Sequence, residues 1–163
     1  MTVIDGGEPR NAPAAHMHGF LTQDGLPPGE LVEAGRAEVT RYGGELVDER
    51  VEAVRPGFRV RLADGSELIA GRGWSDDVVL FEHKFVPGTG MIDALGCDTD
   101  ERGFVTVDAN GATSTPGVWA AGNVVNSRAQ VIVAAGAGAA AAMAIHADIT
   151  RERTRFAVEA DRG

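Results

Sequence analysis

The sequence TSTPGVWAAGNV, residues 113–124, decides the fold of this chain. It predicts a turn, then a short buried strand over residues 118–121, then a tight corner at Gly122-Asn123. An alanine-rich helix over residues 130–149 is expected next. The segment therefore predicts a strand that ends in a corner just before a helix begins.

This arrangement suits an anionic or electron-accepting ring as a ligand. A helix N-terminus offers unpaired N–H groups and the positive end of the helix dipole. Gly136 and Gly138 let a ligand approach the backbone, and the Asn123 amide can donate to and accept from a ligand hydroxyl. The alternative is that the two glycines only permit close packing between helix and strand.

The N-terminal half predicts further α/β structure. Residues 2–5 are expected to end a buried strand, and a polar, turn-rich loop follows over residues 6–13. A helix is expected over residues 30–42, because Gly43-Gly44 is a typical stop signal. Residues 45–70 predict an antiparallel meander turned at Asp64-Gly65.

The rest of the chain is less regular. A short buried strand is expected over residues 78–81, inside an irregular segment, and another over residues 104–107. Residues 151–163 are charged and predict a frayed tail.

Residues 113–138 resemble one known family. The family motif is T-S-x-P-G-V-[FWY]-A-A-G-D, followed by an A-A-G-x-G helix start. It belongs to the flavin-binding half of thioredoxin-reductase-like, FAD-dependent pyridine nucleotide–disulphide oxidoreductases. This chain departs from the motif at Asn123, where aspartate is usual. The N-terminal strand, loop, helix and meander are similar as well. The resemblance implies an α/β, three-layer FAD/NAD(P)-binding, Rossmann-like fold, reduced in size and carrying an antiparallel β-meander.

The resemblance also implies FAD as the cofactor and gives roles to particular residues. Asp5 would bind the adenosine ribose, although it could equally be a turn or helix-cap residue. Asn11 would approach the ring from the N-terminal loop, and Asn123 would hold the ribityl chain. The full set of implied cofactor-binding residues is Asp5, Arg10, Asn11, Gly122, Asn123, Gln130, Val131, Gly136 and Ala137. No catalytic residue and no metal ligand is assigned.

The departures from the family are large. The Gly-x-Gly-x-x-Gly loop that should precede Asp5, the NADPH domain and its Cys-x-x-Cys pair are all missing. We therefore expect residues 1–150 to form a shortened FAD domain, joined irregularly near residues 70–73 and 83–85, with residues 151–163 as the tail. By resemblance the enzyme class is an FAD-dependent NAD(P)H oxidoreductase, without disulphide reduction by this chain alone. The alternatives are a non-catalytic interaction or oligomerisation module derived from that fold, or a non-functional fragment that folds poorly.

The composition and charge of the chain argue against some classes of binding partner. The 163 residues are 44% apolar and 24% charged, which is typical of a globular domain. A net charge of −9 argues against binding to nucleic acid or anionic membranes, and one cysteine excludes an internal disulphide. No stretch is expected to span a bilayer, because glycines and His146 interrupt the apolar run over residues 131–147. We expect a cytoplasmic protein that binds no metal and forms a homodimer or joins a complementing chain.

Overall fold

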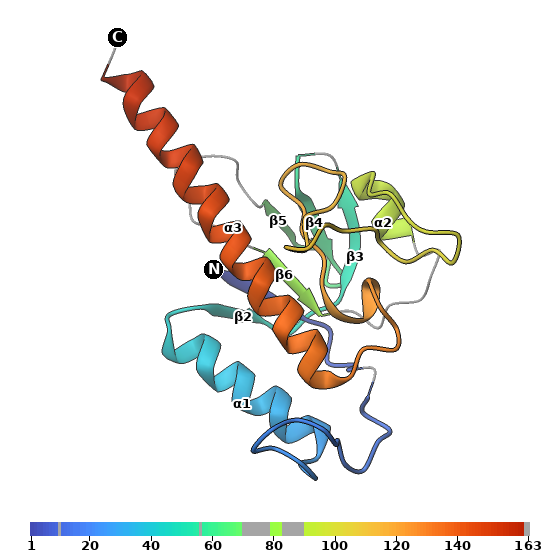
Figure 1. Ribbon diagram of the computed structural model, residues 1–163. Helices are drawn as coiled ribbons and strands as arrows, with labels where there is room; N and C mark the ends of the chain where they lie inside the picture. Colours follow the sequence, from blue (N-terminus) through green and yellow to red (C-terminus); the bar gives the residue numbers. More distant parts are fainter. Residues whose placement is uncertain (10, 56, 70–78, 83–89, 162–163) are drawn as a thin grey trace. The chain divides into compact units, whose positions relative to one another are not determined.

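The computed structural model of the chain describes residues 1–9, 11–55, 57–69, 79–82 and 90–161. The chain divides into two compact units, Met1–Leu95 and Gly96–Gly163. Figure 1 labels the helices and most of the strands. The first unit contains a parallel and an antiparallel sheet, and the second is built on one long helix. The predicted α/β class is confirmed, although the division into two units was not expected.

A parallel sheet forms the first part of unit 1. Strands β1 (Thr2–Asp5), β2 (Glu45–Val47) and β6 (Val79–Glu82) lie in the order β2-β1-β6. Both neighbours run parallel to β1, which requires a crossover between β1 and β2. Helix α1 (Pro28–Arg41) provides it. The helix predicted over residues 30–42 is thus confirmed, beginning two residues earlier because proline suits the first helical turn.

The meander is an antiparallel sheet of β3 (Val51–Arg55), β4 (Arg59–Leu62) and β5 (Glu67–Ile69). Its predicted turn is present at Asp64, whose Oδ1 accepts the Ser66 N–H at 2.8 Å. Placing all of residues 45–70 in the meander was wrong, because β2 pairs with β1 instead. The strands of residues 45–70 thus divide between two sheets, because pairing with a distant strand, and not the local pattern, decides where β2 lies.

The core of unit 1 lies between these sheets. Ile4, Val60 and Leu62 are almost fully buried and contact one another, with Val47, Val51 and Leu68 packed around them. Ile4 therefore faces the meander. Because successive strand side chains point to opposite faces, the next residue, Asp5, points away from this core.

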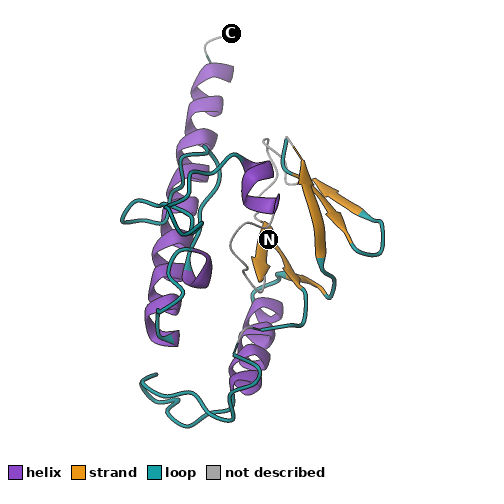
Figure 2. Cartoon of the chain, turned by 90° about the vertical axis from the view of Figure 1, so that its right-hand side faces the viewer, coloured by secondary structure: helices purple, strands orange, loops and turns teal. Residues whose placement is uncertain are grey.

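Two strands predicted in unit 2 were wrong. The segments 104–107 and 118–121 contain only single bridges, Thr99 to Val105 and Ala112 to Trp119, and most of this region is loop (Figure 2). Short side-chain hydrogen bonds stabilise these loops, for example from the amides of residues 110 and 112 to Asp108 Oδ1. A short helix in unit 1 that was not predicted, α2, covers Gly90–Leu95.

The last helix, α3 (Val131–Ala160), runs eleven residues beyond its predicted end at Ile149. Most of the expected frayed tail is therefore helical, supported by the Arg151–Asp148 ion pair one turn apart. The expectation that no stretch could span a bilayer was also wrong by length and composition, since α3 has a mean hydropathy of 1.6 over 18 residues. Helices of soluble proteins pass the same test, so this finding assigns no membrane location.

The irregular middle of the chain can be followed only in part. The strand predicted over residues 78–81 is confirmed as β6, one residue later. The two expected joins, near residues 70–73 and 83–85, lie outside the described residues.

Candidate functional site

Thr113 organises the loop that leads to the corner in unit 2. Its hydroxyl donates to the Val118 carbonyl at 3.0 Å and accepts the Thr115 N–H at 3.1 Å. The Cys97 thiol donates to the same hydroxyl at 3.6 Å. These bonds hold residues 113–118 as a closed turn, so the chain leaves it in a fixed direction.

The corner itself is a 3-10 helix, η1 (Gly122–Val124), that lies against the start of α3. Gly122 has a φ of +77°, a conformation that favours glycine, and a Cβ there would lie 3.8 Å from the Ala134 Cβ. The Gly122 carbonyl accepts the N–H groups of Val125 and Asn126 at 3.1 and 2.9 Å. Within unit 2 the structure therefore places Gly122 beside the first turn of α3.

Two buried polar atoms near this corner lack partners. The Asn123 Oδ1 and the Trp119 Nε1 are buried and have no hydrogen-bond partner among the described residues. A buried amide oxygen without a donor costs on the order of 1–3 kcal/mol, so such atoms are uncommon in stable folds. A ligand hydroxyl would satisfy Asn123 Oδ1 as a donor.

The start of α3 is also open for a ligand. Gln130 precedes the helix with extended backbone, and its side chain makes no capping hydrogen bond to the first turn, which begins at Val131. Gly136 and Ala137 are exposed on the next turn, and a Cβ added at Gly136 would meet no atom of the described residues within 4 Å. Those residues of unit 2 that were predicted to hold the flavin end of a cofactor therefore share one helix start and the corner beside it.

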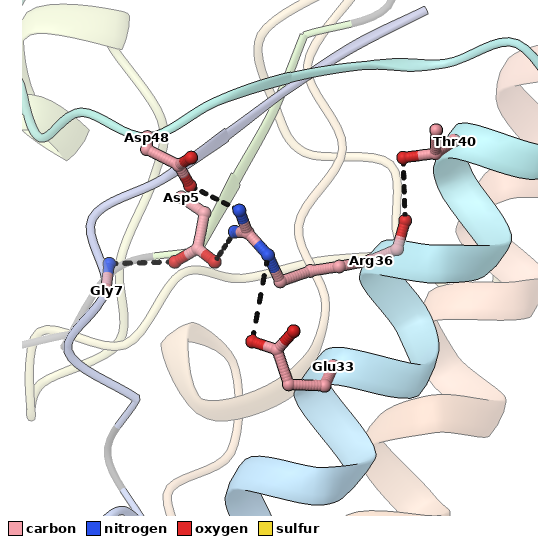
Figure 3. Close-up of polar contacts among 6 residues, drawn as sticks. All are labelled: Asp5, Gly7, Glu33, Arg36, Thr40 and Asp48. Carbon is pink, nitrogen blue, oxygen red and sulfur yellow. Dashed lines mark hydrogen bonds and ion pairs between the residues drawn. The ribbon is translucent and has the colours of Figure 1, made fainter.

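In unit 1, Asp5 is the centre of a polar cluster (Figure 3). It is 7% exposed and ends β1. Its Oδ1 accepts the Gly7 N–H at 2.8 Å, and its Oδ2 accepts Arg36 Nη1 at 2.6 Å. The same guanidinium donates to Asp48 through Nη2, and its Nε lies 3.9 Å from Glu33 Oε1.

Arg36 and Asp48 were not among the predicted site residues. The hydrogen bonds that Arg36 donates to Asp48, and then to Asp5, raise the pKa of Arg36 above its already high value, so it remains charged. The spacing of residues in the sequence could have indicated a role for Arg36. It lies four residues after Val32 and three before Val39, on the partly buried face of α1. A cation on such a face usually has a buried partner.

The N-terminal loop contains the remaining predicted residues. Arg10 lies outside the described residues. Asn11 is half-buried in a turn in which its carbonyl accepts the Ala14 N–H at 2.9 Å. The loop then closes on itself, because Met17 is buried and exchanges backbone hydrogen bonds with Gly25 and Leu26.

Asp24 should make this loop sensitive to acid. Its carboxylate accepts the Gly19 N–H at 2.9 Å and contacts His18, and these bonds lower the pKa of Asp24 below 3.8. A lowered pKa stabilises the loop above pH 3.8, and this contribution is lost as the pH falls through the folded-state pKa. We expect the Gly19 amide to titrate in NMR spectra with a midpoint below 3.8. An Asp24→Asn variant should lack this titration, and its persistence there would contradict the assignment.

A comparison with protein families identifies the chain. Residues 45–139, more than half of the sequence, match the model described as pyridine nucleotide-disulphide oxidoreductase. The chain belongs to this family. The match includes the meander, the Thr113 turn, the corner and the start of α3.

Curated relatives match part of the chain. The chain is 39% identical over 77 residues to an NADH dehydrogenase of Ferdinandcohnia aciditolerans, which covers 47% of this chain and 15% of the relative. It is 32% identical over 110 residues to apoptosis-inducing factor 3 of mouse, and the match covers 58% of this chain and 18% of the relative. The chain thus matches less than a fifth of the length of these relatives.

Solved structures of the oxidoreductase fold agree over most of the chain. HlmI has a TM-score of 0.82 and 27% identity, covering 98% of this chain and 87% of that one. A protein of Bacillus anthracis described as a thioredoxin reductase, TrxB, has a TM-score of 0.78 and 17% identity, covering 93% and 91%. An oxidoreductase of Agrobacterium tumefaciens has a TM-score of 0.76 and 20% identity, covering 91% of this chain and 90% of that one. The resemblance to thioredoxin-reductase-like oxidoreductases, and the FAD/NAD(P)-binding fold that it implied, are confirmed.

Proposed function

We propose that this chain binds FAD and serves as the flavin-binding module of a thioredoxin-reductase-like oxidoreductase. The observation that carries the proposal is the Asn123 Oδ1, which is buried next to the start of α3 and has no donor in the described part of the chain. The ribityl chain of a flavin has hydroxyls that would donate to this oxygen. The residues present thus fit the cofactor that the family implies.

The chain's own groups would bind and orient the cofactor. The first N–H groups of α3, after Gln130 and at Val131, point out of the helix and would stabilise negative charge on the pyrimidine side of the ring. Gly136 and Ala137 leave room for the ring beside the backbone. In unit 1, Asp5 would accept hydrogen bonds from the adenosine ribose. When bound, FAD would supply the chemistry of hydride transfer.

Disulphide reduction by this chain alone is not part of the proposal. Reduction through a resident dithiol needs two cysteines, and the sequence has one. That cysteine, Cys97, is buried, and its thiol donates a hydrogen bond to the Thr113 hydroxyl. We propose instead that the reductant and the final acceptor are held by another chain or domain, and that the protein is cytoplasmic.

Replacing Asn123 with alanine should lower flavin affinity about tenfold, because one hydrogen bond to a buried acceptor is lost. The fold should not weaken, since the oxygen that disappears has no partner among the described residues. Flavin content is measured from the visible absorption spectrum of the purified protein, and stability from urea denaturation.

Asn126→Ala is the matched control. Asn126 is also an asparagine near the corner, but its Oδ1 already accepts the Arg128 N–H at 3.0 Å. This variant should lose some stability and keep its flavin. A colourless wild-type protein that also fails to bind added FAD would overturn the proposed function.

One observation favours a second function, a non-catalytic module that self-associates. Of α3, only Ala141 is buried, and Met143 is 70% exposed. Further large apolar side chains on the helix are exposed at Ile132, Val133, Phe156 and Val158. We propose that a second copy of the chain would cover this surface. Light scattering and the visible spectrum of the purified protein distinguish the two functions. A colourless dimer favours the self-associating module, and a yellow monomer favours the FAD-binding module.

A further inference from the structure

We propose that Arg36 is a positioning residue for adenosine recognition, holding the Asp5 carboxylate so that it accepts hydrogen bonds from the two ribose hydroxyls. The inference rests on the proposed binding of FAD. It assigns a role to a residue that no motif in the sequence singles out.

The first support is the place of the cluster in the sheet. Asp5 is the last residue of β1, and Asp48 directly follows β2, which runs parallel to it. The two carboxylates therefore lie at the carboxyl edge of the sheet, where open α/β folds bind their ligands. Arg36 reaches both of them from α1 (Figure 3).

The second support is the hydrogen-bonding capacity of Asp5. An ionised carboxylate accepts about four hydrogen bonds, two at each oxygen. The Gly7 N–H uses one site on Oδ1, and Arg36 Nη1 uses one on Oδ2. Among the residues that the structure describes, nothing else bonds to Asp5, so one site remains on each oxygen, which is what a pair of adjacent hydroxyls needs. Arg36 thus fixes the carboxylate from one side and leaves the other side free to accept.

The third support is the charge and burial of the cluster. Asp5 is almost fully buried, and a buried carboxylate is costly unless it is paired. Arg36 is held in turn by Asp48 and Glu33, which are exposed. Three carboxylates share one guanidinium, so the cluster carries excess negative charge. It therefore suits neutral hydroxyls and disfavours a phosphate at the same point.

A purely structural ion pair would behave differently from a positioning pair. Loss of a structural pair would weaken the fold and lower the affinity for every flavin alike. Loss of a positioning pair lowers the affinity for FAD and leaves that for FMN unchanged, because FMN has no adenosine. The ratio of the two affinities therefore separates the roles.

The experiment measures the dissociation constants of FAD and FMN for the full chain, stripped of flavin, by fluorescence quenching. For Arg36→Ala we expect FAD affinity to fall about tenfold and FMN affinity to stay within twofold of wild type. Arg36→Lys should recover part of the loss. In an Asp5→Asn background, Arg36→Ala should have little further effect, because it acts through Asp5.

The matched control is Arg59→Ala, which removes an arginine–carboxylate pair of 3.0 Å, to Glu67, in the same unit. It should leave both affinities unchanged. Equal losses of FAD and FMN affinity in Arg36→Ala, or none, would overturn the inference while the proposed function stands. If Arg36→Ala does not fold, the ratio of FAD affinity to FMN affinity is measured for Arg36→Lys and Asp48→Asn instead and compared with that of the wild type. A wild-type chain that binds neither flavin would overturn the proposed function itself.

Discussion

Flavin should be lost from a Gly136→Val variant that folds as well as the wild type. The proposed function places the ring beside the exposed backbone at Gly136, and an isopropyl group would occupy that space. Among the described residues, a Cβ at this position meets no atom within 4 Å. Valine is also a better helix former than glycine, so α3 should not weaken. We expect at least a tenfold fall in bound flavin at unchanged stability, measured by absorbance and urea denaturation.

Ala135→Val is the matched control for this result. Ala135 is also exposed on α3, and the next residue along a helix points about 100° away. The same side chain placed there should leave flavin binding intact. Full flavin retention in Gly136→Val would contradict the position assigned to the ring, and equal loss in both variants would point to a general effect on the helix.

Gly111→Ala should have the largest effect on the stability of unit 2. Gly111 has a φ of +81°, which costs an alanine about 1–2 kcal/mol. Its added Cβ would lie 3.0 Å from the Ala120 carbonyl oxygen and 3.1 Å from the Ala141 Cβ, so the loop and α3 would have to separate. With about 1–2 kcal/mol for this crowding, we expect the free energy of unfolding to fall by about 2–4 kcal/mol in urea denaturation.

The control, Gly96→Ala, separates backbone strain from crowding. Gly96 lies in the same unit with a φ of +69°, but the nearest atom to its added Cβ is Thr115 Oγ1 at 3.9 Å. It should lose only the strain cost, about 1–2 kcal/mol. If the two variants lost the same amount, the packing of Gly111 against Ala141 would contribute nothing to stability.

Local signals predicted the regular elements of unit 1 well. Pro28 and Gly43-Gly44 limit α1, and the Asp64-Gly65 turn joins β4 to β5, because each of these residues constrains its own backbone. The same signals failed in residues 96–130. Short apolar runs there predicted strands, but closed turns form instead, stabilised by a hydrogen bond that the Asp108 carboxylate accepts and one that the Thr113 hydroxyl donates.

The candidate site shows a similar division. Asn123 and the glycines of α3 could be found from the sequence, since a motif of neighbouring residues contains them. Arg36 could not be assigned to Asp5, which is 31 residues away along the chain. Only the parallel pairing of β1 with β2, and the crossover by α1, bring the two together.

The sequence by itself determined the family, the α/β class and the presence of a corner followed by a helix. These follow from residues that act on their own backbone or lie within a few positions of one another. Tertiary structure alone decided that β2 leaves the meander for β1, and that Asp5 is held by Arg36. It also decided that the Asn123 oxygen is buried without a donor among the residues that the structure describes. Each of these depends on contacts between distant segments, and neither local backbone preference nor hydrophobic period specifies such contacts.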